Sequence, residues 1–194
     1  MSLKILLIDS DSERSSSLTE SLVAAGFAVS HAEAGSDLVE TVKRLSPDLV
    51  VIDMALPDRD ALEGVRSLSA KAPRPIVMFA DKDDPAFVAE AIAAGVCSYN
   101  LSNVSNREMK AIVASAVALF RRYSKIETEL AAASAALGER RLIERAKAAL
   151  MAARKITEPA AYRWLQRTAM NENRRIGQVA ADVIKGEGGN DLHA

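Results

Sequence analysis

Short apolar runs alternate with amphipathic stretches over the first hundred residues. The apolar runs have the length of strands buried on both faces and lie at residues 4–8, 27–32, 48–53, 75–80 and 96–101. Apolar positions recur at helical spacing in the stretches at 13–25, 38–45 (with Ser36 as its expected cap), 59–71 and 85–94. This alternation predicts an α/β fold with a five-stranded, parallel, flavodoxin-like sheet. Ligands of such sheets bind at the carboxyl ends of the strands, where Asp9, Asp53 and Ala80 fall.

A different pattern begins at residue 104. Apolar residues recur at alternating steps of three and four, with no Pro or Gly between them, at Met109, Ile112, Ala116, Leu119, Tyr123, Ile126, Leu130, Ala133 and Leu137. This spacing is the a/d seam of a coiled coil. An ordinary amphipathic helix packed on the sheet would account for residues 104–120, but a small domain cannot cover the stripe beyond Arg121. We therefore predict a homodimer whose seam is formed by Leu119, Tyr123, Ile126, Leu130, Ala133 and Leu137.

Three shorter amphipathic segments follow Gly138, which interrupts the heptads. The first covers residues 140–154, the second is capped by Thr157, and the third opens at Asn171 or Asn173 and ends at Gly186. Together they predict a C-terminal three-helix bundle, followed by a disordered tail. The predicted organisation is a receiver-like domain at 1–103, a coiled-coil linker helix at 104–138, an output domain at 139–186 and a tail at 187–194.

The formal charge is divided unevenly along the chain. Residues 1–103 carry 9 Lys and Arg against 16 Asp and Glu, whereas residues 139–186 carry 11 against 5. A basic C-terminal part joined to an acidic N-terminal part indicates two functions, and the basic one is compatible with nucleic acid.

Composition excludes several classes of protein. One cysteine allows no internal disulfide, and two histidines with one cysteine are too few for a plausible structural zinc site. No apolar run is long enough to span a membrane and the N-terminus does not resemble a signal peptide, so we expect a cytoplasmic protein. No paired carboxylates, nucleophile–base pair or glycine-rich phosphate loop is present, so we do not expect an enzyme and identify no catalytic residues.

The pieces ILLIDSD, PDLVVIDMALPD, PIVMFA and AAGVCSY resemble the receiver domain of bacterial response regulators. The resemblance implies that an acidic pair after the first strand holds Mg²⁺ and that the aspartate after the third strand, here Asp53, accepts a phosphoryl group. It also implies that a Thr or Ser after the fourth strand and a Lys after the fifth detect that group. In this chain Asp9 matches, whereas Ser10, Ala80 and Ser102 stand at the other three positions, with Asp11 one residue late.

These departures remove the groups that report phosphorylation. Ala80 has no hydroxyl to hydrogen-bond a phosphoryl group, and Ser102 has no positive charge to neutralise it. We therefore predict that Asp53 is a remnant of a phosphoacceptor rather than a switch. Asp9, Asp11 and Asp53 are then either a relic acidic cluster or a weak Mg²⁺ site, and no cofactor is required.

The pieces IERAKAALM, ITEPAAYRWL and AMNENRRIGQVA resemble, in order and spacing, an ANTAR domain, the RNA-binding output module of antitermination regulators. One mild departure is Ala148, where that family often has Gly. Receiver, long helix and ANTAR together resemble the antiterminators of nitrate and nitrite assimilation (NasT-like), and the amidase-operon antiterminators share the layout. The resemblance implies binding to hairpins in nascent leader RNA, which keeps a terminator from forming. It also implies sequestration by a ligand-sensing partner that resembles a periplasmic solute-binding protein.

RNA binding requires cations for phosphates, and flat side chains or hydrogen-bonding groups for unpaired bases. On these grounds we predict an RNA-binding surface formed by Lys147, Arg154, Tyr162, Arg163, Arg167, Asn173, Arg174 and Arg175. Each single Lys or Arg is otherwise explained as part of a solvated face. Tyr162 is as readily a core residue as a stacking one, and Trp164 fits the core better.

Two other functions are compatible with the same residues. A phosphorylation-dependent response regulator could use the basic bundle to bind RNA or the major groove of DNA. An interaction adaptor could instead use the basic face to bind an acidic protein.

Overall fold

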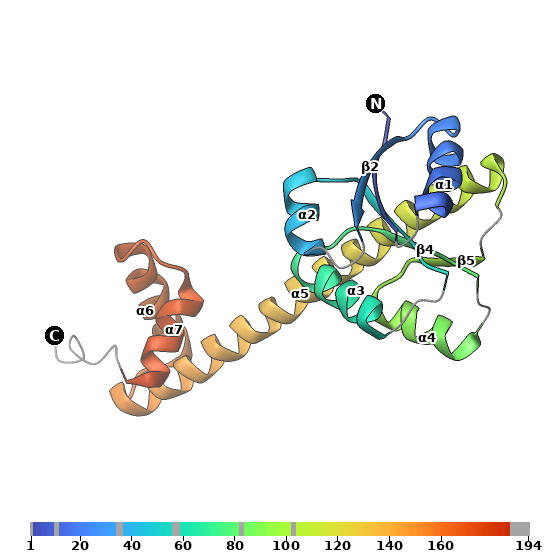
Figure 1. The fold of residues 1–194 in the computed structure, drawn as a ribbon. Helices are drawn as coiled ribbons and strands as arrows, with labels where there is room; N and C mark the ends of the chain where they lie inside the picture. The colour runs from blue at the N-terminus through green and yellow to red at the C-terminus, as the bar shows by residue number, and fades with distance from the viewer. Residues whose placement is uncertain are drawn as a thin grey trace. The chain divides into compact units, whose positions relative to one another are not determined.

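The computed structural model describes residues 2–9, 12–33, 37–55, 59–81, 84–101 and 104–186 (Figure 1). The chain divides into two compact units, Met1–Ser124 and Lys125–Ala194. Four residues that the sequence singled out, Ser10, Asp11, Ser36 and Ser102, lie outside the described residues, as does the predicted tail at 187–194.

The first unit is built on one parallel sheet with the strand order β2-β1-β3-β4-β5. Its strands are β1 (Lys4–Asp9), β2 (Ala28–Glu33), β3 (Leu49–Asp53), β4 (Ile76–Ala80) and β5 (Ser98–Leu101). The helices between them are α1 (Ser12–Ala24), α2 (Leu38–Leu45), α3 (Arg59–Lys71) and α4 (Pro85–Ala94). The predicted five-stranded parallel sheet is therefore confirmed.

Each face of the sheet has its own hydrophobic core, because successive side chains of a strand point to opposite faces. Leu6 and Ile8 of β1 pack with buried residues of α2, α3 and α4 on one face. Ile5 and Leu7 pack on the other face with Leu22 of α1 and with the start of the long helix α5 (Asn106–Arg154). The central strands β3 and β4 are buried along their whole length, as their continuous apolar runs predict.

Side chains at two helix ends determine where those helices begin. α2 begins after Asp37, whose Oδ1 accepts a hydrogen bond from the Glu40 backbone N at 3.1 Å, so the cap is Asp37 and not the predicted Ser36. α5 begins with a reciprocal capping box. The Glu108 backbone N donates to Ser105 Oγ at 3.3 Å, and Glu108 Oε2 accepts from the Ser105 backbone N at 2.8 Å.

Helix α5 is longer than its sequence suggests. It spans 49 residues and passes through Gly138, so the prediction of a separate helix from residue 140 is wrong. One glycine in a helix interior costs only about 1 kcal/mol relative to Ala, which does not break a helix with ordered turns on both sides. Met109, Val113 and Ala116 are buried against the sheet, whereas residues 125–141 are all exposed.

The second unit contains the C-terminal end of α5 together with α6 (Glu158–Asn171) and α7 (Ile176–Lys185). Its small core is formed by Ala146, Leu150, Ala161, Leu165, Ala169, Val179 and Ala180. Trp164 is partly buried against this core, as expected. The predicted three-helix bundle is confirmed, with the end of α5 as its first helix. In the part of the chain that the structure describes, every helix is too short or too polar to cross a membrane.

Replacing Gly138 with Ala tests the continuity of α5. Gly138→Ala is expected to raise the free energy of unfolding by about 0.5–1 kcal/mol, because Gly loses more backbone entropy than Ala in a helix. Nothing lies within 4 Å of the position that the new Cβ would take. Urea denaturation followed by far-UV circular dichroism measures the change.

Gly95→Ala is the matched control and is expected to destabilise the protein. Gly95 has a φ of 116°, and its new Cβ would collide with the Ser69 side chain. A Gly138→Ala protein no more stable than the original would show that α5 is not continuous at this position.

Candidate functional site

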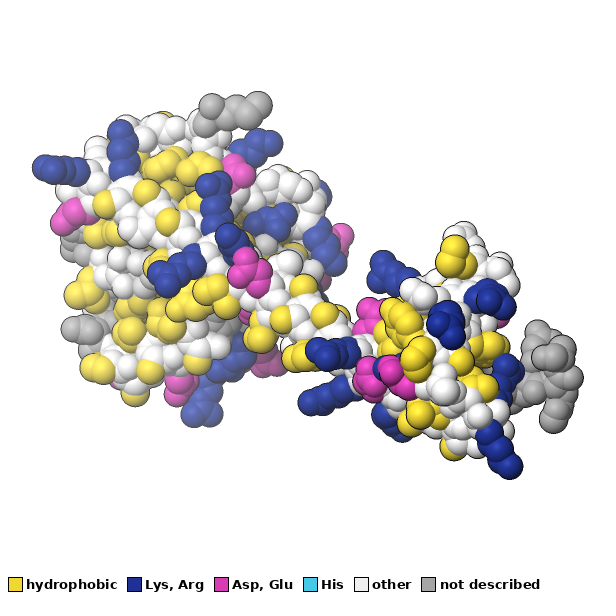
Figure 2. Space-filling model, turned by 180° about the vertical axis from the view of Figure 1, so that it is seen from behind, with side chains coloured by type: hydrophobic (Ala, Val, Ile, Leu, Met, Phe, Trp, Pro, Cys, Tyr) yellow, Lys and Arg dark blue, Asp and Glu magenta, His cyan; other side chains and the backbone are white. Residues whose placement is uncertain are grey.

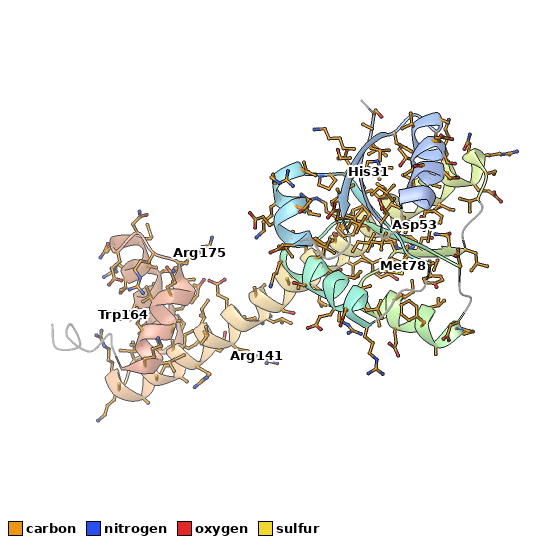
Figure 3. All side chains as sticks on the ribbon, in the orientation of Figure 1. His31, Asp53, Met78, Arg141, Trp164 and Arg175 are labelled. Atoms are coloured by element: carbon orange, nitrogen blue, oxygen red, sulfur yellow. The ribbon has the colours of Figure 1, made fainter. Side chains whose placement is uncertain are left out.

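Two carboxylates meet at the carboxyl edge of the sheet. Asp9 ends β1 and Asp53 ends β3, and the two residues are direct partners in the parallel register. Asp53 is only 5% exposed and lies at the end of the central strands (Figure 3). His31, on the neighbouring strand β2, places its Nδ1 3.6 Å from Asp9 Oδ2. This contact could not be predicted from the sequence, because it depends on β2 lying beside β1.

At the end of β4, where the resemblance to receiver domains implies a Thr or Ser, this chain has Ala80. Ala80 ends β4 and is fully buried, and its neighbour Phe79 is the register partner of Asp53. Asp9 and Asp53 supply two carboxylates, whose oxygens are ligands that Mg²⁺ prefers. Within the described ranges, no three His, Cys, Asp or Glu side chains gather closely enough to hold a metal ion. The third predicted metal ligand, Asp11, lies outside these ranges.

The second unit has an open pocket of about 700 Å³ between α6 and α7. It is lined by Tyr162, Gln166, Ala169, Met170, Asn173, Arg174, Arg175, Ile176 and Gln178. Four of these residues, Tyr162, Asn173, Arg174 and Arg175, belong to the predicted RNA-binding surface. The structure therefore brings together an aromatic ring on α6 and the polar turn that precedes α7.

The turn between α6 and α7 depends on Asn173. Its φ of 53° is left-handed, a conformation that Asn adopts more readily than most residues. The Arg174 backbone N donates to the Ala169 carbonyl at 2.9 Å and closes the end of α6. The Arg175 backbone N then donates to Gln178 Oε1 at 3.1 Å at the start of α7. This turn places Arg174 and Arg175 in the lining of the pocket.

Arg174 is held by acidic side chains of its own unit. Its Nη1 donates to Glu172 Oε2 at 2.8 Å, and its Nη2 donates to the carboxylate of Asp182 on α7. The hydrogen bond to Asp182, followed by that to Glu172, raises the pKa of the guanidinium. Most of the charge of Arg174 is thus balanced within the protein, and its main role is to fasten the turn to α7.

Lys147 is similarly engaged. Its ammonium is nearly buried and donates to Glu144 Oε1 at 2.9 Å and to Glu158 Oε1 at 2.5 Å. The bond to Glu158, followed by that to Glu144, raises the pKa of Lys147 above its ordinary value of 10.5. Lys147 Nζ also lies 6.0 Å from the centre of the Tyr162 ring. Its place is between α5 and α6, which the sequence could not foresee because Glu158 belongs to another helix.

The other predicted RNA-binding cations differ in their exposure and in the side chains that they contact. Arg154 lies over the Trp164 ring, with 4.7 Å between its guanidinium carbon and the ring centroid. Arg163 and Arg167 lie exposed, one turn apart on α6, and Arg175 is exposed at the rim of the pocket. Among the described residues these three arginines form no ion pair with a carboxylate. Figure 2 shows Lys and Arg side chains distributed over the visible face of this unit.

Several residues of the pocket and its surroundings were not predicted. Gln166, Met170 and Gln178 line the pocket. They were not predicted because they are neither charged nor aromatic. The i, i+4, i+8 spacing of Tyr162, Gln166 and Met170 was a usable signal. Arg141 is an exposed cation on α5 that was also missed (Figure 3).

Comparison with known proteins agrees with both halves of this description. The model of the response regulator receiver domain matches residues 5–114, and the model of the ANTAR domain matches residues 131–184. The chain therefore belongs to the response regulators, and within them to those that carry an ANTAR domain. Members of this group regulate transcription and are not enzymes.

Individual relatives cover different shares of the chain. The transcriptional regulatory protein PdtaR of Mycobacterium tuberculosis H37Rv is 31% identical over 183 residues, 94% of this chain and 89% of that protein. The DNA-binding response regulator MtrA of Mycolicibacterium smegmatis is 32% identical over 110 residues, 57% of this chain and 48% of that protein. The receiver domain of a modulated diguanylate cyclase from Desulfovibrio desulfuricans G20 has a TM-score of 0.56 at 18% identity. It covers 63% of this chain and 99% of that one, and shows the fold alone.

The ion pairs of Lys147 generate a prediction about pH. Lys147→Met keeps the aliphatic stem and removes the charge, so the melting temperature of the second unit is expected to fall at neutral pH. Because folding raises the pKa of Lys147, its stabilisation is complete below pH 10.5 and is lost as the pH rises through the folded value. The difference between the two proteins should therefore narrow above pH 10.5.

Melting curves followed by circular dichroism between pH 7 and pH 11.5 measure this difference. Lys155→Met, at an exposed position, is the control and should have little effect at any pH. A difference for Lys147→Met that stays constant across this range would contradict a role for the charge.

Proposed function

We propose that this response regulator binds hairpins in nascent leader RNA through its ANTAR domain and so prevents transcription termination. The observation that carries the proposal is the combination of Tyr162 at an open pocket with exposed Arg163, Arg167 and Arg175 around it. RNA loops present unpaired bases for stacking beside phosphates that need cations, and this surface supplies both.

Binding to duplex DNA is the second candidate function. A basic three-helix bundle can place a helix in the major groove, and MtrA, a relative over part of the chain, is described as DNA-binding. That similarity spans 110 residues, about the length of the receiver match, and PdtaR is the relative that extends over nearly the whole chain. The pocket also favours RNA, because a base can enter it only when unpaired.

We further propose that a partner protein, and not phosphorylation, controls RNA binding. The buried methyl group of Ala80 cannot donate a hydrogen bond to a phosphoryl group on Asp53. Any Mg²⁺ would bind weakly, through the carboxylates of Asp9, Asp11 and Asp53. Because this chain resembles the antiterminators of nitrate and nitrite assimilation, the proposed partner is a ligand-sensing protein similar to a periplasmic solute-binding protein, which releases the regulator when its ligand arrives.

RNA binding without phosphorylation is the first expected result. The protein should bind a leader RNA with two small hairpins in preference to duplex DNA of equal charge, with no phosphodonor present. Asp53→Asn should bind equally well, because no step requires a phosphoryl group. Fluorescence anisotropy at several salt concentrations measures both affinities.

Arg163→Gln with Arg167→Gln should weaken binding and reduce the slope of log affinity against log salt by about two units, one for each lost phosphate contact. Equal affinity for duplex DNA would contradict the RNA proposal. Hairpin binding that appears only after treatment with a phosphodonor would contradict control without phosphorylation.

We also propose that the regulator forms a homodimer through α5. The predicted seam is uncovered in the single chain, with Leu119, Tyr123, Ile126, Leu130 and Leu137 between 42% and 65% exposed. Figure 2 shows hydrophobic side chains along this part of the helix. Pairing two such stripes would bury them, which is the main stabilising contribution in a coiled coil.

Leu130→Lys is expected to weaken or abolish the dimer, because two charges would face each other inside the seam. Ala135→Lys adds the same side chain on the opposite side of the helix and should leave the dimer intact. Sedimentation equilibrium of both proteins measures the association constant. The seam would be refuted if Leu130→Lys and Ala135→Lys had the same effect.

A further inference from the structure

We infer that the pocket between α6 and α7 is a nucleobase site, which takes one unpaired base of an RNA loop. The base would stack on Tyr162, contact Met170 and form hydrogen bonds with the side-chain amides of Gln166 and Gln178. The inference rests on the proposed RNA-binding function and specifies how the RNA would be recognised.

The wall of the pocket on α6 is formed by one stripe of side chains. Tyr162, Gln166 and Met170 are spaced i, i+4, i+8 and therefore lie above one another on one face. Met170 is 81% exposed, an unusual exposure for a large apolar residue that contributes nothing to the core. A polarisable thioether packs well against a flat ring, so a base in this pocket would cover an apolar surface that is otherwise left in water.

The polar groups of the pocket suit the edge of a base. The side chain of Gln166 forms no hydrogen bond with any other described residue and offers both a donor and an acceptor. Gln178 uses its Oε1 to accept a hydrogen bond from the Arg175 backbone N, which leaves its amide NH₂ free to donate. Neutral amides of this kind read the donor and acceptor pattern of an unpaired base.

The charges near the pocket favour a base over a phosphate. Arg174 is balanced by Glu172 and Asp182, which also lie close enough to repel an anion. Of the three predicted arginines that form no ion pair with a carboxylate among the described residues, Arg163 and Arg167 do not line the pocket, and Arg175 lines it but is exposed to solvent. Phosphates of the RNA would therefore lie along the outer side of α6, and the base would enter between the helices.

Lys147 acts in this arrangement as a positioning residue. Its ammonium lies over the Tyr162 ring and is held by Glu144 and Glu158, so the ring is supported from the interior of the unit. Tyr162 is still 39% exposed on the side of the pocket. An aromatic ring that is already fixed loses little conformational entropy when a base stacks on it.

The test uses the full-length protein and a hairpin selected for binding from a pool with a randomised loop. Each loop nucleotide is replaced in turn by an abasic one, and the affinity is measured by fluorescence anisotropy. Loss of one particular base is expected to weaken binding by about 5- to 150-fold, the range for one stacked base. Tyr162→Ala and Met170→Ala should each weaken binding to the intact hairpin, and Tyr162→Phe should not.

A double-mutant cycle, which combines a protein substitution with an abasic RNA, tests whether the critical base binds in this pocket. Met170→Ala should weaken binding to the intact hairpin but add nothing when the critical base is already missing. Because Met170 is highly exposed, this variant keeps the fold even if Tyr162→Ala does not. Met151→Ala, at a partly exposed Met on α5 outside the pocket, is the matched control and should change neither affinity. Gln166→Ala should reduce discrimination between the selected base and other bases at the critical position.

The outcomes separate the two proposals. If the pool yields no hairpin that binds, the RNA-binding function itself fails. If a hairpin binds tightly but tolerates abasic replacement at every position, or if Met170→Ala weakens intact and abasic hairpins equally, the nucleobase site is refuted while RNA binding stands.

Discussion

One continuous helix, α5, contributes to one hydrophobic core of the first unit and to the core of the second unit. Its N-terminal turns bury Met109 and Val113 against the sheet, and its C-terminal turns bury Ala146 and Leu150 in the three-helix bundle. Between these regions, residues 125–141 are exposed and no core supports them. An isolated helix in water depends on intrinsic propensity, which the many alanines of this segment supply, and gains further from burial of an apolar stripe. The exposed seam is therefore the part of the chain with the strongest physical reason to pair.

The sheet imposes a second constraint, which acts on the acidic edge. Parallel pairing aligns the ends of neighbouring strands, so Asp9 and Asp53 must come together once β1 lies beside β3. The receiver fold thus brings Asp9 and Asp53 together, although Ala80 has no hydroxyl that could form a hydrogen bond with a phosphoryl group. Retention of the acidic residues is therefore weak support for a phosphorylation switch, because the aligned strand ends alone place them together.

The basic residues of the C-terminal unit differ in whether their charge is paired with a carboxylate. Lys147 and Arg174 are engaged with carboxylates of the same unit, one between α5 and α6 and the other between the turn and α7. Both hold helices together. Arg163, Arg167 and Arg175 remain exposed to solvent, and these are the residues that we propose as contacts for RNA phosphates. On the proposed function, the exposed arginines, and not Lys147 or Arg174, would determine the salt dependence of RNA binding.

Local periodicity in the sequence determined the strands, most helix limits and the heptad seam, because these features depend on residues only a few positions apart. It also placed Tyr162, Asn173, Arg174 and Arg175 in one candidate surface. Only the structure revealed that α5 continues through Gly138, because the small cost of one glycine does not break a helix with ordered turns on both sides. Tertiary structure also decided the partners of Lys147 and the approach of His31 to Asp9, which depend on helix packing and strand order. The neutral residues Gln166, Met170 and Gln178 come together in one pocket only when α6 and α7 are folded against each other, because the distances between them are not contained in the sequence.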